Sequence, residues 1–285
     1  MTGVATRPIG VFDSGVGGLS VLRALHAELP LEKFFYVADN GHAPYGERDD
    51  RHVIVRSHAI TRYLVTHQHI KALVVACNTA TAAAIASLRR DFATLPIVGI
   101  EPALKPATAH SQTRRIGVMA TRGTLKSQKF QTLLRSLQTQ AQTQTQTRFV
   151  LQACDGLADA IEHADTAKIV AACAQYTSAM GRFGMETGSM DTLVLGCTHY
   201  AFATDVLRSL VGEGVQFLEG GAPVARQTRR LLEQHGWLAP SADADTEALQ
   251  HAPTQFATTG DAEVLRGALQ SWLHLHAPVQ VLAIA

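Results

Sequence analysis

The chain alternates between short apolar runs and longer segments in which apolar residues recur at helical spacing. Several of the runs are apolar throughout, which is typical of parallel strands covered on both faces. This alternation predicts an α/β fold with right-handed crossovers. The predicted strands are Ile9–Asp13, Phe34–Asp39, Leu73–Cys77, Ile97–Ile100, Ile116–Met119, Phe149–Gln152, Leu193–Gly196 and Val215–Leu218. The predicted helices include Gly18–Leu29, Thr79–Arg90, Thr166–Phe183 and Ala222–His235.

Two pairs of similar segments indicate that the chain has two related halves. The segment IGVFDSG at Ile9 is similar to IGVMATRGT at Ile116, and LVVACNTATA at Leu73 is similar to LVLGCTHYAF at Leu193. Chance similarity between buried strands is an alternative for the first pair. The second pair also shares a Cys-Thr or Cys-Asn-Thr continuation, which makes chance a poorer explanation. We therefore expect two similar lobes, each a mainly parallel sheet flanked by helices.

Composition excludes several classes of protein. The 285 residues are 46% hydrophobic and 17% charged with a net charge of +1, a globular composition with room for two domains. Because basic residues are spread along the chain, we expect no nucleic-acid or membrane partner. No secretory signal pattern is evident and no apolar run reaches the ~18 residues that span a bilayer, so a cytoplasmic location is expected. The low-complexity stretch Gln138–Thr147 is expected to be a solvated loop or a frayed helix end.

The 4 cysteines are expected to be free thiols, because cytosolic chains of this length rarely contain a disulfide framework. Cys154 and Cys173 do not follow a strand that leads into a polar loop, so we expect them to be buried packing residues. There is no CxxC motif, and the paired histidines have no thiol or carboxylate at metal-ligand spacing. We therefore expect no metal site.

Cys77 ends a predicted strand and is followed by Asn78, Thr79 and an alanine-rich helix. In a parallel sheet the functional crevice lies at the carboxyl ends of the strands. Asn78 or Thr79 is expected to cap the helix, whose N-terminus would lower the pKa of a nearby thiol and bind a substrate carboxylate. For Cys77 alone, a buried structural cysteine is the more frequent case.

Cys197 repeats this pattern in the second half of the chain. It also ends a predicted strand, and Thr198 and His199 follow it. A histidine two residues from a thiol can help it to lose or receive a proton. The repetition makes a catalytic role for both cysteines the better interpretation.

Other polar residues stand near predicted strand ends. Asp13 and Ser14 precede a glycine-rich run that lacks the lysine of a P-loop and does not match GxGxxG, so nucleotide binding is not favoured. Asp13 is either part of the site or a turn residue. Tyr45 and Gly46 form a turn that can pack or bind a ligand. Glu162, by spacing alone, is an ordinary solvated helix residue.

Racemisation at a carbon atom needs a proton removed on one face and delivered on the other. Two thiols facing each other across the substrate satisfy this requirement, one as thiolate and one as thiol, and their roles exchange with direction. The developing negative charge must also be stabilised, and Asn78, Thr79 and Thr198 could do so by holding a carboxylate. One cysteine from each lobe would supply the geometry.

Taken together, these segments resemble the glutamate racemase family, part of the aspartate/glutamate racemases. The similar segments occur in the family's order and span most of the chain. They are GVFDSGVGGLSV (10–21), PYGER (44–48), ACNTATA (76–82), GIEPALKPA (99–107), IGVMATRGT (116–124), LGCTHY (195–200) and TTGD (258–261).

The resemblance implies a reaction without pyridoxal phosphate or metal, at a site in the cleft between the lobes. It implies that Cys77 deprotonates D-glutamate and Cys197 deprotonates L-glutamate, with Asp13 and His199 assisting. It also implies D-glutamate supply for peptidoglycan, and family members often form homodimers. The implied substrate-binding residues are Asp13, Ser14, Tyr45, Gly46, Asn78, Thr79, Thr198 and His199, with Glu162 at an acidic position whose local motif is looser here.

The first strands and the last helices are expected to share one lobe. Residues 1–98 and 209–285 would form the lobe carrying Asp13 and Cys77, and residues 99–208 the lobe carrying Cys197 and His199. Three alternatives stay open at this point. The first is a related enzyme that acts on aspartate, a hydantoin or an arylmalonate. The second is a two-lobed amino-acid-binding protein, and the third is a redox dithiol protein. The last requires the two cysteines to approach to disulfide distance.

Overall fold

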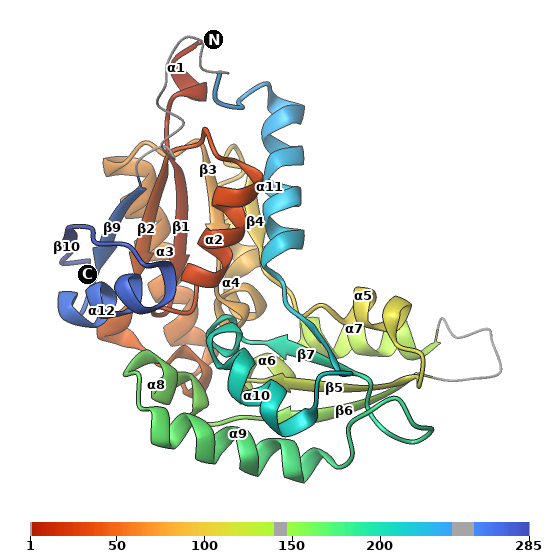
Figure 1. Ribbon diagram of the computed structural model, residues 1–285. Coiled ribbons are helices and arrows are strands. Elements are labelled where there is room, and N and C mark those ends of the chain that lie inside the picture. Colours follow the sequence, from red (N-terminus) through yellow and green to blue (C-terminus); the bar gives the residue numbers. More distant parts are fainter. Residues whose placement is uncertain (1, 140–146, 241–253, 285) are drawn as a thin grey trace, which may run out of the picture.

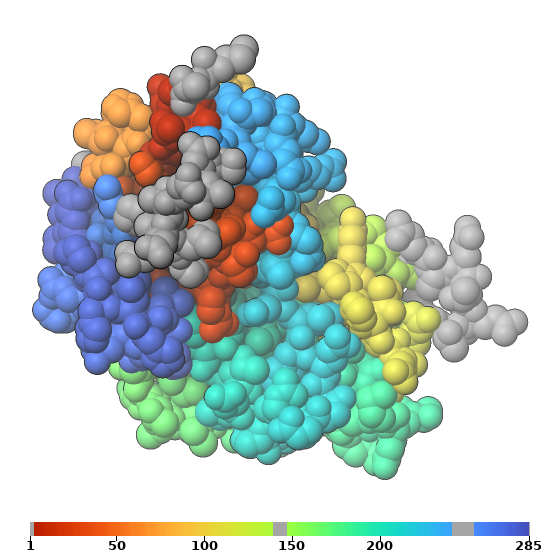
Figure 2. All heavy atoms as spheres, turned by 45° about the horizontal axis from the view of Figure 1, so that its top comes forward, coloured from red at the N-terminus to blue at the C-terminus, as the bar shows by residue number. Residues whose placement is uncertain are grey.

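The computed structural model describes residues 2–139, 147–240 and 254–284, which form two α/β lobes (Figure 1). Each lobe is a parallel sheet with helices on both faces, so the expected fold class is confirmed. In Figure 2 the second lobe, coloured green to cyan, packs directly against the red and blue segments of the first. Residues 140–146 of the Gln/Thr-rich stretch lie outside the described residues.

The first sheet consists of parallel strands that are mostly buried along their length, as expected where helices cover both faces. These strands are β1 (Ile9–Asp13), β2 (Phe34–Ala38), β3 (Ala72–Val75), β4 (Ile97–Gly99), β9 (Thr254–Thr258) and β10 (Val279–Val281). In the described part of the chain their order across the sheet is β10-β9-β2-β1-β3-β4. Neighbouring strands are parallel throughout this order.

Alternate side chains of this sheet enter two hydrophobic cores. Val11 and Tyr36 pack with the helices on one face, whereas Phe12 and Phe35 pack with those on the other, which is the two-residue period of a strand. The helices of the first face are α2 (Leu19–Glu28), α11 (Gly221–His235) and α12 (Ala262–Leu273). Those of the second face are α3 (Asp50–His67) and α4 (Asn78–Asp91).

The second lobe repeats this plan with a smaller sheet. Its strands are β5 (Arg115–Ala120), β6 (Arg148–Ala153), β7 (Thr192–Gly196) and β8 (Gln216–Leu218), in the order β6-β5-β7-β8 within the described residues. One face is covered by α8 (Leu157–Glu162), α9 (Thr166–Met180) and α10 (Thr204–Val211). The other is covered by α5 (Leu104–His110) and α7 (Gln128–Thr139).

Short helices occupy the N-terminus and the loops around the strand ends. They are α1 (Thr2–Ala5), α6 (Arg122–Lys126) and the 3-10 turns η1 (Asn40–His42), η2 (Tyr45–Glu47) and η3 (Thr198–Ala203). Capping residues mark the start of one long helix and the end of another. Asp49 accepts from the amide of His52 at the start of α3, and Gly236, with φ of 65°, ends α11 in the left-handed region. In the described ranges no helix is both long and apolar enough to cross a membrane.

The structure differs from the sequence-based domain limits at the return to the first lobe. Strand β8 still pairs with β7, with Gln216 opposite Thr192, so the chain leaves the second sheet only after Leu218 and not near residue 209. The first crossing follows β4, which ends at Gly99, one residue beyond the expected limit. The sequence predicted a strand at Val215–Leu218 but not the sheet that it joins, because local periodicity does not show which strands pair.

The strand register explains why distant polar residues meet. Phe12 lies opposite Val75, so Ser14 and Cys77, each two residues farther on, leave the sheet at the same level. In the second lobe Ala120 lies opposite Gly196, so the following Thr121 and Cys197 also emerge together. Both carboxyl edges thus carry a thiol.

A buried ion pair ties the opposite end of the first sheet to its surroundings. Lys71 Nζ lies 2.5 Å from Glu32 Oε2, and their side chains are 0% and 2% exposed. Lys71 also donates to the carbonyls of Ala5 and Trp237, while Glu32 accepts from the amide of Ala239. The pair therefore fixes the N-terminal segment and the chain after α11 to the base of the sheet.

Replacing Lys71 by methionine is expected to destabilise the fold strongly. The change leaves Glu32 buried without its cation, which typically costs about 3–5 kcal/mol. Urea unfolding of the wild type and the K71M variant measures the difference. The matched control is Arg90→Met, because Arg90 pairs with Asp91 on the surface and its loss should change the midpoint far less. Equal midpoint shifts in the two variants would contradict the assignment.

Candidate active site

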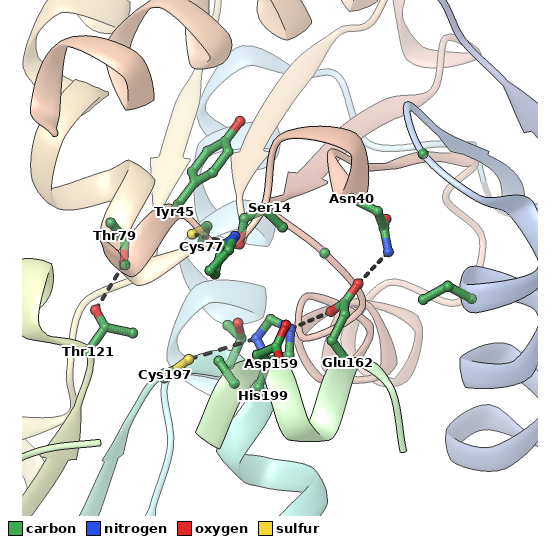
Figure 3. Close-up of a pocket in the computed structure, with 18 of the residues that line it drawn as sticks. Ser14, Asn40, Tyr45, Cys77, Thr79, Thr121, Asp159, Glu162, Cys197 and His199 are labelled. Atoms are coloured by element: carbon green, nitrogen blue, oxygen red, sulfur yellow. Dashed lines mark hydrogen bonds and ion pairs between the residues drawn. The ribbon is translucent and has the colours of Figure 1, made fainter. Parts of the chain in front are cut away.

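A cavity of about 350 Å³ lies between the two lobes, lined by loops at the carboxyl ends of both sheets (Figure 3). Its volume suits a small metabolite. Ten of the site residues expected from the sequence line it: Ser14, Tyr45, Gly46, Cys77, Asn78, Thr79, Glu162, Cys197, Thr198 and His199. Asp13 does not line the cavity; it is fully buried one layer behind.

Cys77 itself caps helix α4, in place of the expected Asn78 or Thr79. Its Sγ accepts from the amide of Ala80 at 3.4 Å and lies 3.6 Å from Ser14 Oγ. Burial, reinforced by the charge of Asp13, raises the pKa of the Cys77 thiol well above its ordinary value. The Ala80 amide at the helix N-terminus lowers the pKa as expected, but burial and Asp13 outweigh it, so Cys77 is protonated at neutral pH.

Asp13 stands directly behind this thiol. Its carboxylate accepts from the amide of Gly18 at 2.6 Å and from Thr198 Oγ1 at 3.4 Å. Burial raises the pKa of Asp13, and the charge of His199 opposes this only in part. A carboxyl group with a raised pKa beside a thiol can exchange a proton with it near neutral pH.

Cys197 forms the start of a second group of titratable residues. Its Sγ lies 3.8 Å from His199 Nδ1, and His199 Nε2 lies 2.7 Å from Glu162 Oε2. Burial opposes the charged imidazolium, but the bonds to Cys197 and Glu162 outweigh it and raise the pKa of His199 well above its ordinary value. The two cysteines therefore stand in unlike environments, Cys197 beside His199 and Cys77 beside Ser14 and the amide of Ala80.

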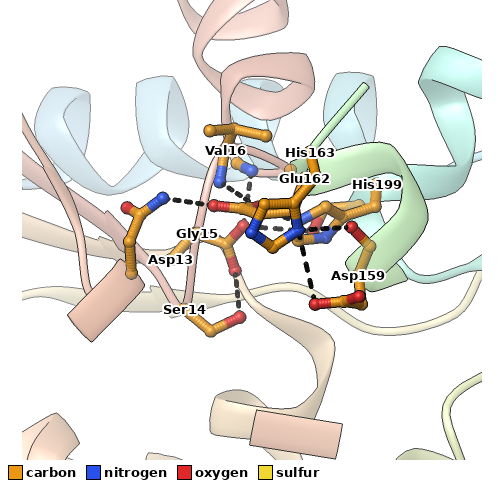
Figure 4. A network of polar contacts seen from close by, with 12 residues as sticks. Asp13, Ser14, Gly15, Val16, Asp159, Glu162, His163 and His199 are labelled. Atoms are coloured by element: carbon orange, nitrogen blue, oxygen red, sulfur yellow. Dashed lines mark hydrogen bonds and ion pairs between the residues drawn. The ribbon is translucent and has the colours of Figure 1, made fainter. Parts of the chain in front are cut away.

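Glu162 reaches across the cleft from α8 to the first lobe (Figure 4). Its carboxylate accepts from the amide of Val16 at 2.9 Å and from Asn40 Nδ2. The glycine-rich loop makes this approach possible: a Cβ at Gly15 would lie 2.3 Å from Glu162, and a Cβ at Gly17 would lie 2.3 Å from His199. Because these glycines have no side chain, the loop can contact the second lobe as well as a ligand.

Tyr45 is held in the cavity wall by a buried polar cluster around Asp39. Tyr45 Oη donates to Asp39 at 2.5 Å, and Arg56 donates to both oxygens of the same carboxylate at 3.1 and 3.0 Å. Arg56 also donates to the carbonyl of Ile284. The hydroxyl of Tyr45 is thus engaged within the protein, and Tyr45 and the adjoining Gly46 line the cavity.

Several lining residues were not identified from the sequence. Thr121 caps α6 at the end of β5, and its Oγ1 lies 3.0 Å from Thr79 Oγ1 of the other lobe. The similarity of IGVMATRGT to IGVFDSG was the signal that could have identified it. Asn40 and Asp159 also line the cavity, without such a signal. Within the described ranges, no three His, Cys, Asp or Glu side chains are grouped to hold a metal ion.

All 4 cysteines are free in the structure. Each of the two α/β lobes contributes one thiol to the shared cavity, an arrangement that fits an isomerase of the racemase class. The model of the Asp/Glu/Hydantoin racemase family matches residues 9–228, and the chain belongs to this family.

The similar proteins support this assignment along the whole chain. A glutamate racemase of Ectopseudomonas mendocina is 45% identical over 275 residues, which cover 96% of this chain and 97% of the relative. One from Cupriavidus pinatubonensis is 42% identical over 287 residues, covering 100% and 98%. The crystal structure of a Bacillus anthracis glutamate racemase isoform matches with a TM-score of 0.81 at 31% identity over 98% of each chain. An Escherichia coli glutamate racemase, crystallised with L-glutamate and the activator UDP-MurNAc-ala, matches with a TM-score of 0.79 at 29% identity, covering 98% of this chain and 99% of that one.

Replacing Asp13 by asparagine is expected to lower the pKa of Cys77, because the charge of Asp13 helps to raise it. The pH dependence of iodoacetamide alkylation, followed by mass spectrometry of the Cys77 peptide, measures this pKa. The alkylation midpoint should move to lower pH in the D13N variant. The control is Glu162→Gln, which removes a carboxylate from the Cys197 side and should leave the Cys77 midpoint in place. An unchanged midpoint in D13N would refute the electrostatic explanation.

Proposed function

We propose that the protein is a glutamate racemase that interconverts L- and D-glutamate without an added cofactor. The observation that carries the proposal is the pair of thiols, Cys77 from one lobe and Cys197 from the other, lining one cavity. The names of the relatives indicate glutamate as the substrate. The alternative of a simple binding protein is less favoured, because binding needs neither paired thiols nor a proton-holding partner beside each.

In the proposed reaction of L-glutamate, the Cys197 thiolate takes the Cα proton. The thiol of Cys77 then donates its proton to the opposite face of the carbanion, which gives D-glutamate. His199, whose pKa is raised, lies against Cys197 Sγ, and the raised pKa of Cys77 keeps it a proton donor. The reverse reaction exchanges the roles, with Asp13 accepting the proton that Cys77 must lose first and His199 supplying the proton that Cys197 must gain. Proton exchange with water resets both thiols after product release.

The substrate is proposed to bind through its charged groups. The amino end of α4, with Asn78 and Thr79, and Thr198 from the second lobe offer donors for the α-carboxylate. Within the described chain, Asn78 Oδ1 is buried without a hydrogen-bond partner, so it can accept from a substrate ammonium group. Ser14 and the turn at Tyr45–Gly46 are proposed to hold the remaining polar groups.

The proposed biological role is the supply of D-glutamate for peptidoglycan in the cytoplasm, and a homodimer is the proposed assembly. The family resemblance supports these three statements. The redox alternative is disfavoured because all 4 thiols are free, and Cys77 and Cys197 line a cavity with room for a substrate.

Incubation with L-glutamate in deuterium oxide, without added cofactor, tests the function. Optical rotation should decay while deuterium enters at Cα. Cys77→Ser and Cys197→Ser should each lower the rate at least ~100-fold, since each variant loses one of two essential proton carriers. Cys173→Ser is the matched control, because Cys173 is buried away from the cavity and its change should leave turnover nearly intact. Retained rotation without exchange in the wild type would refute the proposal.

L-Aspartate tests the choice of substrate. It is one methylene shorter than glutamate, so its two carboxylates cannot occupy the same positions as those of glutamate, and a drop in kcat/KM of at least ~10-fold is expected. Polarimetry of both substrates at equal enzyme concentration gives the ratio. A higher kcat/KM for aspartate would assign the protein to the related aspartate activity.

A further inference from the structure

A chain of hydrogen bonds runs from the C-terminal strand of the first lobe to Cys197 in the second. Thr258, at the end of β9, donates through Oγ1 to Asn40 Oδ1 at 3.2 Å. Asn40 Nδ2 donates to Glu162 Oε1, the contact drawn in Figure 3. Glu162 Oε2 lies 2.7 Å from His199 Nε2, and His199 Nδ1 lies 3.8 Å from Cys197 Sγ.

Each bond in this chain fixes the next. Because Thr258 donates to Asn40 Oδ1, the amide of Asn40 can only present its NH₂ group to Glu162. Thr258 is itself fully buried, and its hydroxyl accepts from the amide of Gly260, which leaves its proton for Asn40. The orientation of Asn40 is therefore set by β9.

The carboxylate of Glu162 is the point where the two lobes meet. It is carried by α8 of the second lobe, yet Val16 and Asn40 of the first lobe both donate to it. Its side chain is only 8% exposed and that of His199 only 6%. A buried carboxylate needs such donors to remain charged and in place. Without them Glu162 would turn towards water, and its attraction for His199 would weaken.

We propose that Asn40 and Thr258 are positioning residues of the first lobe that hold Glu162 against His199 and thereby prepare Cys197 for proton transfer. Neither residue needs to touch the substrate for this role. The arrangement makes the readiness of Cys197 depend on closure of the cleft, because Glu162 gains its donors only when the first lobe is in contact. This inference rests on the proposed function for its kinetic consequence, although the hydrogen-bond chain can be tested without it.

The hydrogen-bond chain makes its direct contacts on the side of only one of the two proton transfers. Asp13 and Ser14 adjoin Cys77, whereas Asn40 and Thr258 lead to Cys197. If Cys197 removes the proton of L-glutamate, weakening the chain slows bond breaking in that direction. For D-glutamate it slows the later delivery step, after Cys77 has broken the bond. The two directions should therefore respond differently to deuterium at Cα.

The experiment uses nearly isosteric variants of the full-length protein. Asn40→Leu and Thr258→Val remove the hydrogen-bonding groups, and Thr258→Ser is the matched control that keeps the hydroxyl. We expect kcat/KM to fall about 10- to 100-fold in both directions for N40L and T258V, the loss typical of a hydrogen bond to a charged group. T258S should retain most of the wild-type value. Thermal unfolding verifies that the variants are folded.

The decisive kinetic readout is the primary isotope effect on kcat/KM with Cα-deuterated substrates. In N40L and T258V the effect should rise for L-glutamate and fall for D-glutamate, so that their ratio exceeds the wild-type ratio. A merely structural defect would lower activity without changing this ratio. An unchanged or smaller ratio, or a T258S variant as defective as T258V, would overturn the inference.

Nitrogen-15 NMR of the His199 imidazole tests the same chain independently of activity. The pKa of His199 should fall in N40L and T258V and stay at the wild-type value in T258S. If the wild type failed to racemise glutamate, the proposed function would be refuted. The pKa of His199 in the variants would still test the positioning role. An unchanged pKa of His199 in N40L and T258V would reject the positioning role even in a fully active racemase.

Discussion

The carboxylate of Glu162 joins the two lobes at the site. It is nearly excluded from water and has polar partners from both lobes. Val16 and Asn40 of the first lobe donate hydrogen bonds to it, and His199 of the second lobe contacts it. A buried carboxylate that lost these partners would be strongly unfavourable, so the lobes and the residue constrain each other. The smaller contacts between the lobes, such as that between Thr79 and Thr121, rely on the same relative placement.

The two thiols are chemically similar residues in unlike surroundings. Cys77 is next to a buried carboxyl group, which raises its pKa, while Cys197 is next to a histidine that remains charged. The two thiols therefore differ in their surroundings before any substrate binds. In the proposed two-way reaction, Asp13 and His199 would exchange protons with their thiols. The raised pKa of Asp13 agrees with that role.

The residues that carry the chemistry were recognisable because they follow strands. A thiol after an apolar run, with polar residues and a helix behind it, can be predicted to stand at the edge of a parallel sheet. The same reasoning identified Ser14 and Thr198 but treated Glu162 as a solvated residue, because its helix α8 is short and its partners are distant in sequence. Asn40 and Thr258 had no recognisable signal, since their roles arise only from contacts with each other and with the opposite lobe.

The sequence by itself determined the class of fold, eight of the strands and the positions of both cysteines, because these follow from local hydrophobic periodicity. It did not determine the strands β9 and β10, the late return of the chain after β8, or the protonation of Cys77. Those properties depend on which segments pair and how deeply each group is buried. The pKa of Cys77 shows the physical reason: a helix terminus acts locally and can be inferred from sequence, whereas desolvation and the charge of Asp13 exist only once the sheet has assembled.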